Sequence, residues 1–311
     1  VCATGYTALA FFLPGEAPFK FVMVLVLLSL LFVGWQVQQI QGRGLLESRD
    51  TDYYYLRVAD HEFRGDALRS LYLDTDWEGA KFRDHDGIVH PYTQAYTLVK
   101  AWKPNARAVV FLGGGPHVSP MYFHDHLFPQ AKIRVVEIDP AVTEAAKTFF
   151  DFREDDRMTV ENQDARLTWR SLREPVDVIA VDVFDSLLSP PFHLVTKEYH
   201  QEMYDHLTDG GVMVTNLIDG WGRPEQSRLI RSYVKTVQSV FDAVWIVPTK
   251  GGDEVQNFVV IATKGTPPSL EQIRAVAAKD PAMVGEWVDK IVTSVDPGED
   301  AVLFTDNFSP V

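Results

Sequence analysis

The chain has 311 residues, of which 46% are hydrophobic and 23% are charged, the balance of a folded protein rather than of a disordered one. Its 29 Lys and Arg residues and 43 Asp and Glu residues leave a formal net charge of −14, which argues against binding to a nucleic-acid backbone as the main activity. The single cysteine, Cys2, excludes an internal disulfide framework and a cysteine-built zinc site.

A membrane segment is predicted within residues 1–40. Residues 21–35 read FVMVLVLLSLLFVGW, an uncharged run that with its flanks nearly reaches the ~20 residues needed to span a hydrocarbon core. Trp35 stands where an interfacial aromatic residue would, and the apolar run Val1–Leu13 indicates the end of an earlier membrane helix. The competing interpretations are a buried helix and a signal peptide, although a basic start and a small-residue cleavage site are not evident.

Residues 45–90 are expected to form a small antiparallel β domain. Tyr53–Val58 and Arg69–Leu73 read as strands, and Arg64–Asp66 supplies the turn residues between them. Pro91–Trp102 reads as a helix that leads into the main domain.

Buried strands alternate with amphipathic helices from residue 91 to residue 265. Apolar runs occur at 108–112, 133–138, 176–183, 212–217, 244–247 and 258–262, with helical patterns at 141–150, 196–207 and 225–241. This alternation indicates an α/β domain whose parallel sheet is covered on both faces. Residues 266–311 are expected to form a helical tail that ends in an acidic, proline-containing segment.

A nucleotide site is predicted at the ends of the first two of these strands. Gly113, Gly114 and Gly115 directly follow a buried strand, where glycines allow a tight turn and let backbone amides approach a ligand. Glu137 ends the next strand, 22 residues after Gly115, where a carboxylate can accept both ribose hydroxyls of an adenosine. Asp164 could accept a hydrogen bond from an adenine amino group, or could only cap the helix that follows.

Two carboxylates mark the predicted chemical site. The buried strand at 176–183 delivers Asp182 and Asp185 at its carboxyl end, where ligands bind in open α/β sheets. Carboxylates at this spacing can hold an ammonium group and deprotonate it, which yields a nucleophilic amine. The alternative for Asp185 is the capping of a turn.

Five motifs occur in the order found in a known family. They are GGG at 113–115, VEID at 136–139, QDA at 163–165, VDVIAVDVFD at 176–185 and TKEY at 196–199. In this order they resemble the spermidine synthases, or polyamine aminopropyltransferases. The loop at 191–196 and the ending at 305–310 are closer to membrane-fused relatives of that family.

The resemblance implies a Rossmann-like sheet of the class I methyltransferase type and a group transfer between two small molecules. The donor would be decarboxylated S-adenosylmethionine, and a polyamine would attack the carbon beside its sulfonium and release methylthioadenosine. By position, the glycines and Glu137 would hold the adenosine, Asp164 would contact adenine, Asp182 would act as the base and Asp185 would help to hold the amines. Candidate substrate-binding residues are Tyr54, Tyr92 and Lys250.

Three positions depart from the family's pattern. Pro116 follows the glycines where the family has an Asp that grips the donor's ammonium, Tyr53-Tyr54 replaces a Tyr-Gln pair, and Lys250 stands near the acceptor in place of a Tyr. They leave two alternatives open, namely a methyltransferase-like enzyme that uses intact S-adenosylmethionine and a non-catalytic nucleotide or polyamine sensor.

The remaining expectations concern metals, partners and location. The histidines at 117, 124, 126 and 193 lack a compact ligand motif, so no metal is expected. The expected partners are a small-molecule amine and a membrane but no nucleic acid, and the sequence leaves a homodimer open. The supply of the donor in the cytosol places the catalytic domain on the cytoplasmic side.

Overall fold

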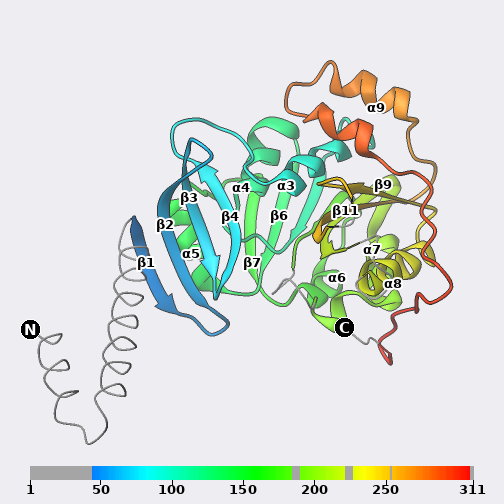
Figure 1. Cartoon of the computed structure of the whole chain (residues 1–311), viewed down its shortest axis with the longest axis horizontal. Coiled ribbons are helices and arrows are strands. Elements are labelled where there is room, and N and C mark those ends of the chain that lie inside the picture. The colour runs from blue at the N-terminus through cyan, green and yellow to red at the C-terminus, as the bar shows by residue number, and fades with distance from the viewer. Residues whose placement is uncertain (1–43, 184–189, 221–226, 253, 309–311) are drawn as a thin grey trace, which may run out of the picture.

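The computed structural model describes residues 44–183, 190–220, 227–252 and 254–308. Its first unit is a four-stranded antiparallel sheet of order β1-β2-β3-β4 (Figure 1). The strands are β1 (Leu45–Asp50), β2 (Tyr55–Phe63), β3 (Asp66–Leu73) and β4 (Asp76–Phe82). The predicted turn between β2 and β3 is a two-residue hairpin loop in which Arg64 and Gly65 have φ of 55° and 94°, as such loops require. This confirms the small antiparallel β unit.

The second unit is a seven-stranded sheet of order β10-β11-β9-β8-β5-β6-β7. Its strands are β5 (Ala108–Leu112), β6 (Lys132–Glu137), β7 (Met158–Asn162), β8 (Val176–Val181), β9 (Leu207–Asp219), β10 (Ala243–Pro248) and β11 (Gln256–Thr263). The five strands from β7 to β9 pair in parallel, which confirms the Rossmann-like α/β fold.

The sequence pattern indicated a parallel sheet, but the observed sheet is not parallel throughout. β11 runs antiparallel to both β9 and β10. The reason is the short connection between Pro248 and Gln256, because a parallel crossover needs a dozen or more residues whereas a short loop returns the chain antiparallel.

Helices and short helical turns connect the strands and cover the large sheet. They are α3 (Pro91–Tyr96), η1 (Thr97–Ala101), α4 (Val118–Tyr122), η2 (Phe123–Leu127), α5 (Pro140–Phe149), η3 (Ala165–Leu167), α6 (Thr168–Ser171), η4 (Phe192–Leu194), α7 (Lys197–His206), α8 (Arg228–Gln238), α9 (Leu270–Ala277) and η5 (Gly285–Lys290). The predicted helix at 91–102 is thus a short α-helix followed by a 3₁₀ turn, and the C-terminal segment has one α-helix and one 3₁₀ turn before an extended end.

The core is divided into two layers by the central strands. Val109 and Phe111 of β5 pack into one hydrophobic cluster, whereas Val110 and Leu112 pack into the cluster on the other face. Alternate side chains of a strand point to opposite faces, so a strand buried on both faces reads as an unbroken apolar run. The small β unit packs against α5, with Leu56 and Leu71 in contact with the cluster that includes Val142.

None of the helices in the described ranges is long and apolar enough to cross a membrane. The predicted membrane segment, residues 1–40, lies outside those ranges.

Candidate active site

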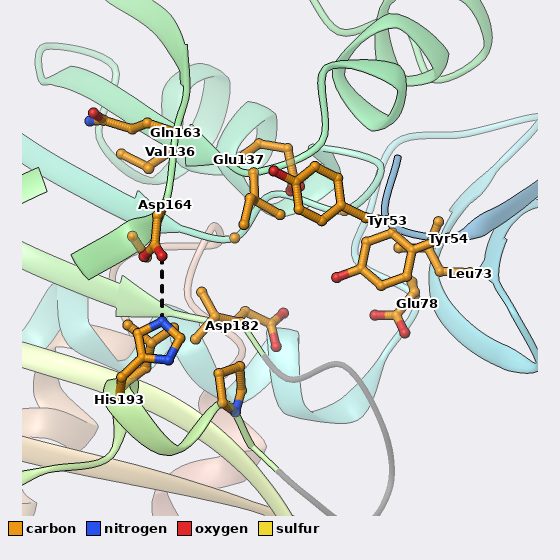
Figure 2. Close-up of a pocket in the computed structure, with 17 residues that line it drawn as sticks. Tyr53, Tyr54, Leu73, Glu78, Val136, Glu137, Gln163, Asp164, Asp182 and His193 are labelled. Carbon is orange, nitrogen blue, oxygen red and sulfur yellow. Dashed lines mark ion pairs between the residues drawn. The ribbon is translucent and has the colours of Figure 1, made fainter. Parts of the chain in front are cut away.

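The candidate site is a cavity of about 160 Å³ at the carboxyl ends of β5, β6 and β8, closed on one side by the small β unit (Figure 2). The predicted residues that line it are Tyr54, Gly113, Gly115, Glu137, Asp164 and Asp182. They come from five separate segments of the chain, and the parallel topology brings them to one edge of the sheet.

The glycine turn is shaped by close approaches of neighbouring backbone and ring atoms. Gly113 has a φ of +79°, and a Cβ there would lie 1.9 Å from the carbonyl oxygen of Asp182. A Cβ on Gly114 would lie 2.4 Å from the His117 ring. Glycine is therefore required at both positions, and the turn leaves the Gly114 amide directed at Glu137.

Glu137 is held in place by two backbone amides. Its Oε2 accepts a hydrogen bond from the Gly114 N–H at 3.0 Å, and its Oε1 accepts one from the Asp139 N–H at 3.0 Å. Burial raises the pKa of Glu137, and these hydrogen bonds offset part of that effect. A carboxylate offers about four acceptor sites, so Glu137 can still accept from a ribose hydroxyl.

Asp164 both caps a helical turn and faces the cavity. Its Oδ1 accepts the Arg166 N–H at 2.8 Å, which is the capping role that the sequence left as an alternative. Its Oδ2 lies 3.5 Å from Nε2 of His193, the pair joined by the dashed line in Figure 2. His193 was not predicted as a site residue; it is brought to the cavity by η4.

Asp182 lies at the end of β8 with two polar neighbours. The Tyr92 hydroxyl donates a hydrogen bond to its Oδ2 at 3.1 Å, and the Asn216 side chain is a second hydrogen-bond partner. Burial nevertheless raises the pKa of Asp182 to about 7. A carboxyl group with this pKa can take up a proton near neutrality, as a general base must.

A second, larger cavity of about 410 Å³ adjoins Asp182 on the side of β9 and β11. Its polar lining includes Asp76, Tyr92, Asn216 and Asn257, and the Asn257 amide donates to Oδ1 of Asn216 at 3.0 Å. The two asparagines were missed because they lie far apart in the sequence, although Asn216 is a polar residue inside the apolar part of β9, which was an available signal.

Lys250 does not join these cavities. Lys250 lies in the loop between β10 and β11, where its side chain is exposed and its N–H donates to the Gln256 side chain at 2.6 Å. It is not among the residues that line either cavity. Asp185 lies outside the described residues. In the described ranges, no group of three or more His, Cys, Asp or Glu side chains could hold a metal ion.

Comparison with known proteins places the chain in a family. Residues 87–268 match the model described as the spermine/spermidine synthase domain, which is more than half of the chain. The chain belongs to that family. It is an enzyme of the polyamine aminopropyltransferase class.

Individual relatives and solved structures are also similar to the chain. A polyamine aminopropyltransferase of Vibrio vulnificus (strain CMCP6) is 28% identical over 216 residues, which cover 67% of this chain and 69% of that protein. The structure of a probable spermidine synthase from Corynebacterium glutamicum ATCC 13032 superposes with a TM-score of 0.67 at 20% identity, over 85% of this chain and 98% of that one. An eEF1A lysine and N-terminal methyltransferase of Bos taurus is 38% identical, but the match covers only 37% of this chain and 18% of that protein.

One departure from the spermidine synthase pattern has a clear packing role. Pro116, which follows the glycine turn, packs against the backbone of β4 at Gly79. A Cβ on Gly79 would lie only 2.5 Å from the Pro116 ring. Pro116 thus joins the glycine turn to the small β unit but brings no charge to the cavity. Any cation that binds beside the turn must find its carboxylate elsewhere.

Proposed function

We propose that the chain transfers an aminopropyl group from decarboxylated S-adenosylmethionine to a polyamine or a related amine. One observation supports this most strongly. The described residues that line the two cavities include the carboxylates Asp76, Glu78, Glu137, Asp164 and Asp182 but no Lys or Arg. Such a lining favours ligands that carry positive charge and no carboxylate.

The charges of the lining also favour one of the two candidate donors over the other. Decarboxylated S-adenosylmethionine has a sulfonium and an ammonium group, both cationic, whereas intact S-adenosylmethionine has a carboxylate as well. That carboxylate would enter a cavity lined by like charges and without a Lys or Arg among the described residues. Since like charges disfavour binding in a partly buried site, we infer that the decarboxylated donor is preferred.

The residues support a direct displacement. The adenosine would bind between the glycine turn, Glu137 and Asp164, and the acceptor amine would enter through the larger cavity beside Asp182. Asp182 would accept a proton from the incoming ammonium group. The amine lone pair would then form a C–N bond to the carbon beside the sulfonium, the C–S bond would break, and its electron pair would remain on the sulfur of methylthioadenosine. Asp185 is proposed to help hold the amine.

The test is the product that the wild-type chain releases. With decarboxylated donor and a panel of polyamines, we expect methylthioadenosine and an acceptor heavier by one aminopropyl group, detected by mass spectrometry. Release of adenosylhomocysteine from intact donor would instead establish the methyltransferase alternative. Release of neither product with any amine would support a sensor.

We also propose that residues 1–40 attach the enzyme to a membrane with its catalytic domain on the cytoplasmic side, as in the membrane-fused relatives. The uncharged run at 21–35 supports this proposal, together with the break in composition that follows it.

A further inference from the structure

Asn216 and Asn257 form a polar pair across two neighbouring strands. In the ladder between β9 and β11, Asn216 lies opposite Val259 and Asn257 lies opposite Ile218, so the two asparagines are diagonal neighbours. Long side chains at diagonal positions on one face of a sheet can reach each other. The Nδ2 of Asn257 donates a hydrogen bond to Oδ1 of Asn216 at 3.0 Å, and Asn216 is only 4% exposed. The buried amide of Asn216 is therefore held from the neighbouring strand.

The hydrogen bond from Asn257 decides which end of the Asn216 amide faces Asp182. A side-chain amide has an acceptor oxygen at one end and a donor NH₂ group at the other. Since Oδ1 of Asn216 is directed at Asn257, the NH₂ group of Asn216 is the end that donates to the Asp182 carboxylate. In the reversed orientation, Oδ1 would face the carboxylate and two NH₂ groups would meet at Asn257. The pair therefore favours a single orientation of Asn216.

Asn257 is itself anchored by its backbone. Its carbonyl oxygen accepts hydrogen bonds from the Thr249 N–H at 3.0 Å and from the Thr249 hydroxyl at 2.9 Å. Thr249 directly follows β10, and the strands lie in the order β10-β11-β9-β8. A chain of hydrogen bonds thus runs across four adjacent strands, from the end of β10 to Asp182 at the end of β8.

We propose that Asn257 is a positioning residue for the base: it keeps the NH₂ group of Asn216 directed at Asp182 and so favours the charged, proton-accepting carboxylate. This assignment rests on the proposed function, in which Asp182 is the base. It extends that function to a residue of β11 that acts on Asp182 through Asn216.

Other titratable side chains surround Asp182, and a change at Asn257 leaves all of them in place. They are Asp76 and Glu78 of β4, His90, Tyr92 and Tyr96 at α3, and Glu137 of β6. Asp164 and His193 lie across the nucleotide cavity. Burial raises the pKa of Asp182 to about 7, and the hydrogen bonds from Tyr92 and Asn216 oppose that rise. A variant that disturbs only the Asn216 bond should therefore raise the pKa of Asp182 further.

The test is a double-mutant cycle on the full chain, followed by two titrations. Leucine has nearly the shape of asparagine but can neither donate nor accept, so the variants are Asn257→Leu, Asn216→Leu and the two combined. The first titration follows kcat/KM for methylthioadenosine release against pH. The second follows the infrared C=O band of the protonated Asp182 carboxyl group, which is identified by its absence in Asp182→Asn.

In Asn257→Leu we expect both titrations to shift upward by about 0.5–1 pH unit, and in Asn216→Leu by about 1–2 units, because the second variant loses a hydrogen bond to a charged group. Adding Asn257→Leu to Asn216→Leu should cause no further shift. At pH values well above the inflection, Asn257→Leu should approach the wild-type rate, since the base itself is intact. The control is Ile218→Leu, a change of shape opposite Asn257 on the same cavity wall, which should leave the infrared inflection in place.

Three outcomes would overturn the assignment. They are an unmoved infrared inflection in Asn257→Leu, an equal further shift in the Asn216→Leu background, which would show that Asn257 does not act through Asn216, and a loss of rate at every pH without a shift, which would indicate a packing role. If a leucine variant does not fold, the corresponding alanine variants repeat the cycle.

Failure of the proposed function is distinguishable from failure of this assignment, because the infrared titration needs no turnover. If the proposed function is wrong, wild type releases no methylthioadenosine, whereas the infrared inflection still moves in Asn257→Leu. If only the assignment is wrong, methylthioadenosine is released and neither titration moves in that variant.

Discussion

At the scale of single residues, Asp182 is a carboxylate whose surroundings oppose its charge. Tyr92 and Asn216 donate hydrogen bonds to it, yet burial raises its pKa to about 7. The protonated form is therefore favoured in the empty site at slightly acid pH, and the charged form becomes dominant only above neutrality. A cationic amine that binds beside Asp182 would favour the charged form and so prepare the base.

The first residue-scale prediction concerns pH. Because a base acts when deprotonated, kcat/KM of the wild type should rise with pH through about 7. In Asp182→Asn this rise with pH should disappear, and turnover should fall by about 10²- to 10⁴-fold. The measurement is initial-rate methylthioadenosine release from pH 5.5 to 8.5. Affinity for methylthioadenosine, which should hardly change, serves as the control. A variant with wild-type turnover would show that another group is the base.

The same shift has a consequence for stability. The pKa of Asp182 is raised from 3.8 to about 7, so its contribution to stability is complete below pH 3.8 and is lost as pH rises through 7. Asp182→Asn removes the buried charge, so its melting temperature relative to wild type should increase between pH 5 and pH 8. A constant difference across that range would contradict the raised pKa.

At the scale of elements, residues near the C-terminus hold one wall of the cavity beside Glu137 and Asp164. Arg166 of η3 pairs with Asp306 at 2.8 Å and also donates to the carbonyl oxygen of His193 at 2.6 Å. The Thr196 hydroxyl donates to Asp306 at 2.6 Å. These contacts join η3, η4 and the chain end, and η4 carries the His193 that faces Asp164.

We expect Asp306→Asn to loosen this wall. The ion pair is partly exposed, so its loss should lower the free energy of unfolding by only about 1 kcal/mol. Affinity for methylthioadenosine should fall by about three- to tenfold, because η4 is less well held. The matched control is Asp300→Asn, which breaks an ion pair with Arg231 of α8, away from the cavity. It should cost similar thermal stability and leave affinity unchanged. If both variants bound methylthioadenosine with equal affinity, the contacts of Asp306 would have no part in holding the site.

At the scale of the whole molecule, the proposed membrane segment precedes the two β-sheet units in sequence. Removal of residues 1–40 should convert a detergent-requiring protein into one that is monodisperse without detergent and that still binds methylthioadenosine. Size-exclusion chromatography with and without detergent, followed by calorimetry, measures both properties. A full chain that is already monodisperse without detergent would contradict the membrane proposal.

Much of this molecule follows from local pattern. Buried runs separated by amphipathic segments predict the α/β sheet because a strand covered on both faces must be apolar at every position. The glycine turn and Glu137 are predicted because a nucleotide needs a close backbone and an acceptor one strand further on. The antiparallel β11 was missed, since apolar runs do not record strand direction and the short loop after β10 decides it.

The acceptor side of the site depends on tertiary structure. Asn216 and Asn257 are 41 residues apart, and only the pairing of β9 with β11 joins them. Lys250 was a reasonable candidate from its position in the chain, but its loop leaves it exposed and outside the cavities. The sequence by itself therefore determined the parallel part of the sheet and the glycine turn with Glu137 at its edge, whose spacing is local, whereas the tertiary structure decided which distant polar side chains meet across the sheet edge.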